Sequence, residues 1–101
     1  MSFRIEILAE AITDIEEIFL WYRLISPQLS GRFQSETETS LHEVLSRPEA
    51  FHTLMQGVRC RRLKRFPYLI VYVLRKELIT VIAVMHEKRN PKAWKKRLRR
   101  K

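Results

Sequence analysis

Two long apolar runs separated by three residues constrain the fold of this chain more than any other feature of its sequence. Residues 69–74 read LIVYVL and residues 78–85 read LITVIAVM, and both are rich in the β-branched and aromatic side chains that favour strands. Because only the segment RKE separates the two runs, they predict an antiparallel hairpin. Neither run alternates between apolar and polar residues, which is typical of central strands covered on both faces.

The charge is concentrated in the second part of the chain. The formal net charge is +9, yet residues 1–58 carry 4 Lys and Arg against 9 Asp and Glu, whereas residues 59–101 carry 16 against 2. The net charges of the two parts are therefore −5 and +14. This concentration indicates an anionic partner, either nucleic acid or an acidic protein. The alternative is a solvated basic face without a partner.

Length and composition predict one domain, which spans residues 1–101. The chain has 101 residues, of which 46% are hydrophobic, and this size supports a single core. The single cysteine, Cys60, excludes an internal disulfide and indicates a reducing compartment. Because no signal peptide and no run of about 18 apolar residues is visible, a soluble cytoplasmic protein is expected. His42 and His52 lack partners at metal-ligand spacing, so neither a metal nor a cofactor is expected.

The first half of the chain predicts an edge strand followed by two helices. Residues 3–8 alternate with a period of two, as a half-buried strand does. The apolar spacing then becomes helical from Ala9, and Ser26-Pro27 ends one helix and caps the next. The second helix ends at Arg47-Pro48, so the pair predicts an αα-hairpin. Ser35, Thr37, Thr39 and Ser40 are expected to face water, and residues 48–57 are expected to form a connection.

The second half carries the basic residues. Residues 58–65 read VRCRRLKR and predict a strand whose cations form a strip facing phosphate or a protein partner. A solvated strand face is the alternative. Asn90-Pro91 is a cap and first-turn proline, so residues 91–101 predict a short basic helix or tail that is ordered with a partner. Trp94 is placed either to stack on bases or to anchor this helix, whereas Tyr68 and Tyr72 are expected in the core.

The order β-α-α-β-β-β resembles the RelE/ParE family of toxins. The resemblance is carried by marks along nearly the whole chain: residues 14–18 (DIEEI), Trp21-Tyr22, Pro48, Val58-Arg59, Leu63, residues 65–68 (RFPY), residues 70–72 (IVY), Ala83-Val84, His86, Arg89, Pro91 and Trp94. It implies an α+β fold in which an antiparallel sheet of about four strands is packed by the αα-hairpin, with a short basic C-terminal helix or tail.

The resemblance implies one of two mechanisms. RelE-like toxins are metal-independent endoribonucleases that cut messenger RNA on the ribosome, whereas ParE-like toxins, often described as plasmid stabilisation proteins, poison DNA gyrase. Arg62 and Arg89 match the ribonuclease pattern, and His86 beside Arg89 is a candidate base. The usual third-strand arginine falls at Leu69, however, and the catalytic tyrosine falls near Trp94 or Lys95.

We therefore expect the toxin of a type II toxin–antitoxin module, of the ParE-like type. The expected partners are an antitoxin, which would carry the complex to its operator DNA, and either gyrase or the ribosome with its messenger. A RelE-like ribonuclease and a non-toxic nucleic-acid-binding module are the alternatives. The residues expected to bind a partner or nucleic acid are Arg59, Arg61, Arg62, Lys64, Arg65, Arg89, Trp94, Lys95 and Arg97.

Overall fold

The two apolar runs form the central hairpin of the sheet in the computed structural model, which describes residues 2–98. Strand β4 spans Tyr68–Arg75 and strand β5 spans Leu78–His86, and they pair antiparallel. Lys76 in the turn between them has a left-handed backbone, with φ of 55°. The predicted hairpin is confirmed.

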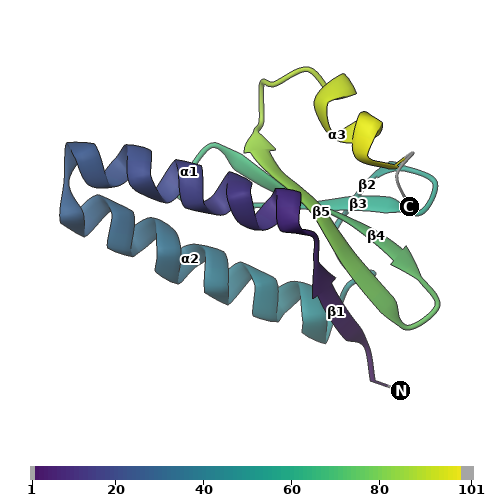
Figure 1. Cartoon of the computed structure of the whole chain (residues 1–101). Helices are drawn as coiled ribbons and strands as arrows, with labels where there is room; N and C mark the ends of the chain where they lie inside the picture. Colours follow the sequence, from purple (N-terminus) through teal and green to yellow (C-terminus); the bar gives the residue numbers. More distant parts are fainter. Residues whose placement is uncertain (1, 99–101) are drawn as a thin grey trace.

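Three further strands complete a mixed sheet in the order β1-β5-β4-β3-β2 (Figure 1). Strand β3 (Val58–Arg62) pairs antiparallel with β4, and β2 (His52–Met55) pairs antiparallel with β3. Strand β1 (Arg4–Ile7) lies at the opposite edge and runs parallel to β5. The α+β fold is confirmed, as is the edge position of β1.

The sheet differs from the expected one in strand number and direction. It has five strands rather than about four, because residues 52–55, expected as part of a connection, form β2. This strand has four residues and is mostly exposed, so it lacks the apolar alternation by which a strand is recognised. The parallel pairing of β1 joins the first strand to the last. Because these strands are not connected by a turn, no turn sequence predicts this contact.

Helices α1 (Ala9–Ile25) and α2 (Pro27–Ser46) form the predicted αα-hairpin. Ser26 is extended between them, with φ of −166°, and its Oγ accepts a hydrogen bond from the Leu29 amide at 3.4 Å. The end of the hairpin with this turn projects beyond the sheet (left in Figure 1). Near this end α1 exposes Leu20, Trp21 and Leu24, the last with 87% of its surface accessible.

The helical hairpin covers one face of the sheet with a core rich in aromatic rings. The Tyr22 ring lies 5.1 Å from that of Phe66 and 5.7 Å from that of Phe33. Tyr72 is fully buried, and its hydroxyl donates to the Pro48 carbonyl oxygen at 2.6 Å. Burial raises the pKa of Tyr72 to about 12. The core position expected for Tyr72 is confirmed, and Tyr68 packs against the same cluster.

Two of the four polar residues of α2 that were expected to face water are buried instead. Thr37 and Ser40 are only 3% and 2% exposed, so the expectation that they face water is wrong. The Thr37 hydroxyl donates to the Phe33 carbonyl oxygen at 2.8 Å. A hydroxyl that is satisfied within its own helix can be buried at little cost. Ser35 and Thr39 are exposed, as expected.

The other face of the sheet packs against α3 (Lys92–Leu98), the predicted C-terminal helix. Trp94 is 6% exposed in a cluster with Cys60, Val71 and Met85. Both faces of the central strands are thus covered, as their continuous apolar sequence predicts. Residues 99–101, the end of the expected basic segment, lie outside the described residues.

Candidate functional site

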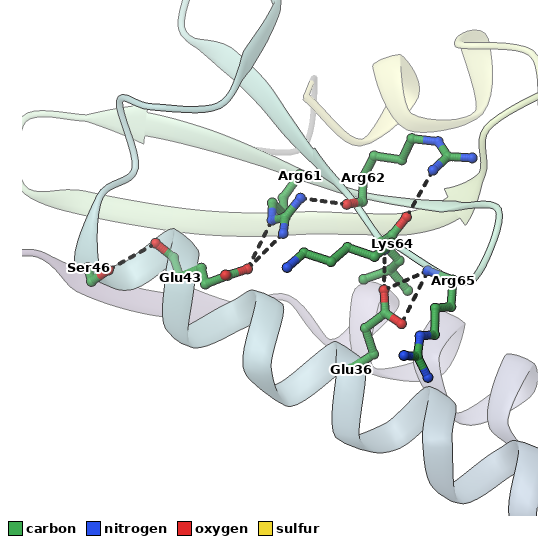
Figure 2. A network of polar contacts seen from close by, with 8 residues as sticks. Glu36, Glu43, Ser46, Arg61, Arg62, Lys64 and Arg65 are labelled. Atoms are coloured by element: carbon green, nitrogen blue, oxygen red, sulfur yellow. Dashed lines mark hydrogen bonds and ion pairs between the residues drawn. The ribbon is translucent and has the colours of Figure 1, made fainter.

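The arginines of β3 point to opposite faces of the sheet, because successive side chains of a strand alternate. Arg61 faces α2, where its Nε and NH2 groups donate to Glu43 Oε1 at 3.1 and 2.8 Å (Figure 2). Its guanidinium lies 4.9 Å from the centre of the Phe51 ring. The hydrogen bond from Arg61 holds the pKa of Glu43 below its usual range. Arg61 therefore joins β3 to α2.

Arg59 lies on the same face and binds the segment that leads into β2. Its NH1 group donates to the carbonyl oxygens of Glu49 at 3.1 Å and Phe51 at 2.8 Å. These bonds satisfy two backbone acceptors of an irregular segment. Two of the five cations expected in one strip thus stabilise the fold.

Arg62 lies on the opposite face and contacts the end of β5. Its Nε donates to Glu87 Oε1 at 2.6 Å, while 54% of its side chain is exposed. The hydrogen bond from Arg62 lowers the pKa of Glu87. Arg62 remains accessible to a partner, although it already holds a carboxylate.

Lys64 and Arg65 follow β3, in the turn that leads to β4. Glu36 of α2 accepts hydrogen bonds from both backbone amides, with 3.0 Å between Arg65 N and Glu36 Oε2 (Figure 2). The side chains of Lys64 and Arg65 are exposed. With Arg32 and Glu36 they line an open hollow of about 770 Å³ beside α2. We call this the α2 hollow. Its cations Arg32, Lys64 and Arg65 are exposed to solvent, whereas the Glu36 carboxylate accepts hydrogen bonds from two backbone amides.

A second, smaller hollow lies where β5 ends. It has a volume of about 130 Å³, and its lining includes Asp14, Glu17, Tyr68, His86 and Arg89. The His86 ring packs edge-on against Tyr68, with 5.5 Å between centres. The His86 Nδ1 atom accepts a hydrogen bond from the Lys88 amide at 3.1 Å. A neutral imidazole that accepts at Nδ1 carries its hydrogen on Nε2.

Leu69, at the position of the usual ribonuclease arginine, lies on the face covered by α3. It is opposite Arg62 in β3 and Met85 in β5. It also packs against the cluster that holds Trp94. Trp94 thus anchors α3 to the sheet, while Lys95 Nζ lies on its ring face, 5.9 Å from the ring centre. Stacking of Trp94 on bases would require it to leave this cluster.

Arg97 is held by an ion pair that the sequence does not announce. Its NH1 and NH2 groups donate to Asp14 Oδ2 at 2.7 Å and Oδ1 at 3.2 Å, and NH1 also reaches the Ile82 carbonyl oxygen at 2.8 Å. Asp14 Oδ2 also accepts from the Val84 amide at 2.9 Å. Asp14 begins the stretch DIEEI of α1, and the sequence of that stretch does not identify Arg97 as its partner. Together these bonds join α1, β5 and α3.

The structure does not bring the expected basic residues into one site. Of them, Arg62, Lys64, Arg65, Arg89 and Lys95 expose their cationic groups over several surfaces, whereas Arg59, Arg61, Trp94 and Arg97 hold elements together. Within residues 2–98, no group of three acidic, histidine or cysteine side chains is arranged to hold a metal ion. Among the described helices, none is long and apolar enough to span a membrane.

The comparisons with known proteins agree with this fold. The sequence model described as the ParE toxin of the type II toxin–antitoxin system parDE matches residues 5–91. The chain belongs to the ParE toxin family. Its fold is similar to a structure described as the chromosomal ParDE toxin–antitoxin system of P. aeruginosa, with a TM-score of 0.72, 17% sequence identity, and coverage of 84% of this chain and 96% of that one. A search of curated proteins found no match.

Membership of the ParE toxin family confirms the expected resemblance and the type II toxin–antitoxin assignment, in which the toxin acts with an antitoxin. The matched region includes both hollows and Leu69, and it ends at residue 91, immediately before α3. The residues that anchor α3, Trp94 and Arg97, therefore lie beyond the part that defines the family in this chain.

Proposed function

We propose that this ParE toxin inhibits growth by poisoning DNA gyrase and does not itself cut RNA. The observation that carries the proposal is the environment of Leu69. A ribonuclease of the related type needs cations on the sheet to stabilise the charge that develops on the phosphate. Here the expected position holds a leucine, packed against the cluster that anchors α3.

The remaining ribonuclease residues are poorly placed for acid–base catalysis. Arg62 is engaged by Glu87 at 2.6 Å, so it would have to exchange that carboxylate for phosphate. His86 Nδ1 accepts a hydrogen bond from the Lys88 amide at 3.1 Å, so this nitrogen is not free to remove a proton from a substrate. These arrangements favour contact with a protein target over cleavage of a 2′-hydroxyl substrate.

An acidic antitoxin is the partner that the charge distribution favours. The α2 hollow presents Arg32, Lys64 and Arg65 to solvent, and Glu36 is engaged by backbone amides. Arginine pairs well with carboxylates in two-point contacts. An antitoxin segment with Asp or Glu residues would therefore neutralise this surface, and the antitoxin would carry the complex to its operator DNA.

Two reactions distinguish the mechanisms. The purified chain is added to gyrase with relaxed plasmid and, separately, to translating ribosomes. We expect loss of supercoiling with DNA breaks trapped on gyrase, while messenger RNA remains intact. Arg75→Ala, an exposed cation at the far end of β4, is the matched control for Arg62→Ala and Arg89→Ala. Messenger cleavage that is lost in the last two variants but kept in the control would disprove the gyrase proposal.

A RelE-like ribonuclease is the second candidate, because the hollow at the end of β5 brings His86 and Arg89 together with Tyr68. It predicts cleavage in the ribosome reaction and none of the trapped gyrase breaks. A non-toxic nucleic-acid-binding module predicts neither, and induced expression would then leave growth unchanged. An inducible expression test with and without a co-expressed antitoxin separates this last case from both toxins.

A further inference from the structure

Among the described residues, strand β1 forms one edge of the sheet and pairs only with β5 (Figure 1). The Arg4 amide donates to the Glu77 carbonyl oxygen at 2.8 Å, and the Leu8 amide donates to the Val81 carbonyl oxygen at 3.0 Å. Both bonds point toward β5. Because backbone groups alternate sides along a strand, the amides and carbonyls of Ile5 and Ile7 point away from the sheet. Such an edge can pair with a further strand.

The two faces of β1 differ sharply in polarity. Arg4 and Glu6 are exposed on one face, whereas Phe3, Ile5 and Ile7 are half-buried on the other and pack against the core. Beneath this second face, β1 and α2 enclose a small hollow of about 160 Å³. Its lining residues are Ile5, Ile7, Glu38, Leu41, His42 and Leu45. A strand that adds to this edge would therefore need apolar side chains on the α2 side.

We propose that β1 pairs antiparallel with β1 of a second copy of this chain, about a two-fold axis at Ile5. Residues whose backbone groups point outward must face one another, so the symmetric registers place Ile5 opposite Ile5, Phe3 or Ile7 of the partner copy. The first register aligns Arg4 with Glu6 of the other copy, and it does so twice. The dimer would be isologous, as most homodimers are.

Charge selects between these registers. With Ile5 opposite Ile5, each Arg4 meets a Glu6 at a non-hydrogen-bonded position, where Cα atoms approach to about 4.5 Å. Shifting one strand by two residues instead places either Glu6 opposite Glu6 or Arg4 opposite Arg4, and like charges directly opposite destabilise a pair. In the favoured register Phe3 also lies opposite Ile7 on the α2 side. In this register each face of β1 therefore meets the same face of the partner strand with matching chemistry, opposite charges on one face and apolar side chains on the other.

A charge-reversal series tests the dimer. The molar mass of the purified chain, tagged at its C-terminus, is measured by sedimentation or light scattering over a range of concentrations. We expect the mass to rise toward two copies. Arg4→Glu or Glu6→Arg alone should raise the dimer dissociation constant about tenfold or more, because two pairs become repulsive. The double variant R4E/E6R should return the constant to within about threefold of the original chain.

Arg23→Glu is the matched control, because Arg23 is an exposed cation of α1 that receives the same charge change away from β1. It should leave the dimer unchanged, and circular dichroism should show every variant folded. A chain that is monomeric at all concentrations overturns the proposal, as does a folded double variant that fails to recover. A dimer abolished by Leu24→Glu but indifferent to Arg4 would place the interface on the exposed apolar end of the helical hairpin, and that result also overturns it.

Discussion

The ion pair between Asp14 and Arg97 offers the sharpest test of how this protein holds α3. Asp14 accepts hydrogen bonds from Arg97 and from the Val84 amide, and the two side chains are only 12% and 15% exposed. Replacing Asp14 with alanine leaves a cation and a backbone donor without their acceptor. Breaking a fully buried pair costs about 3–5 kcal/mol and a surface pair about 0–1. For this partly buried pair we expect a loss of about 3 kcal/mol.

Arg97→Ala should cost less, about 2 kcal/mol, because it removes a cation and leaves Asp14 bonded to the Val84 amide. The double variant should lose little more than Asp14→Ala alone. The resulting coupling energy would be about 1.5 kcal/mol. Urea denaturation gives each free energy of unfolding, and equal slopes against urea show that the same transition is compared. Lys96→Ala, an exposed cation on the same helix, controls for the change in helix propensity.

The fluorescence of Trp94 shows whether α3 itself has detached. Trp94 is 6% exposed and Trp21 is 56% exposed, so a Trp21→Phe background leaves one buried reporter. Asp14→Ala should shift its emission toward longer wavelengths before global unfolding. A coupling energy below about 0.5 kcal/mol, or a Lys96→Ala loss equal to that of Arg97→Ala, would refute the reasoning.

Three further predictions concern single residues. Because the pKa of Glu43 is lowered in the folded protein, the unfolded state binds the proton more readily. The free energy of unfolding should therefore fall as the pH drops through the ordinary carboxyl range, and it should fall less in Glu43→Gln. Unfolding curves between pH 7 and about 3 measure this. Tyr72→Phe should cost about 1–2 kcal/mol in urea denaturation, because the buried Pro48 carbonyl loses its donor. Gly57→Ala should lower the free energy of unfolding by about 1 kcal/mol, and with it the melting temperature, because φ at Gly57 is +78°. An unchanged melting temperature would contradict this.

The parts of the fold that local pattern controls were predictable from the sequence. The αα-hairpin follows from helical spacing broken by Ser26-Pro27, and the central hairpin follows from two apolar runs around a short turn. The parallel contact of β1 with β5 and the Asp14–Arg97 pair join residues that are more than 70 positions apart. Nothing in either local segment specifies its partner, because such contacts arise only when the layers pack.

The basic strip was only partly predictable. The period of a strand already places Arg59 and Arg61 on one face and Arg62 on the other, so this signal was present in residues 58–65. It could not show that Glu43 and two backbone carbonyls would occupy the first two arginines. Charge density predicts that a partner is anionic, but it does not distinguish cations that are free from cations that hold the fold together.

Because α3 covers the second face of the sheet, the reactivity of Cys60 can report whether α3 is in place. The single thiol of this chain is buried in the cluster that includes Trp94, and burial raises the pKa of Cys60, so the reactive thiolate is scarce. A thiol reagent would reach it chiefly when α3 and its neighbours open. The rate of labelling therefore reports how often that opening occurs. A bound partner that holds α3 on the sheet would slow the labelling of Cys60 Sγ, and one that displaces α3 would speed it.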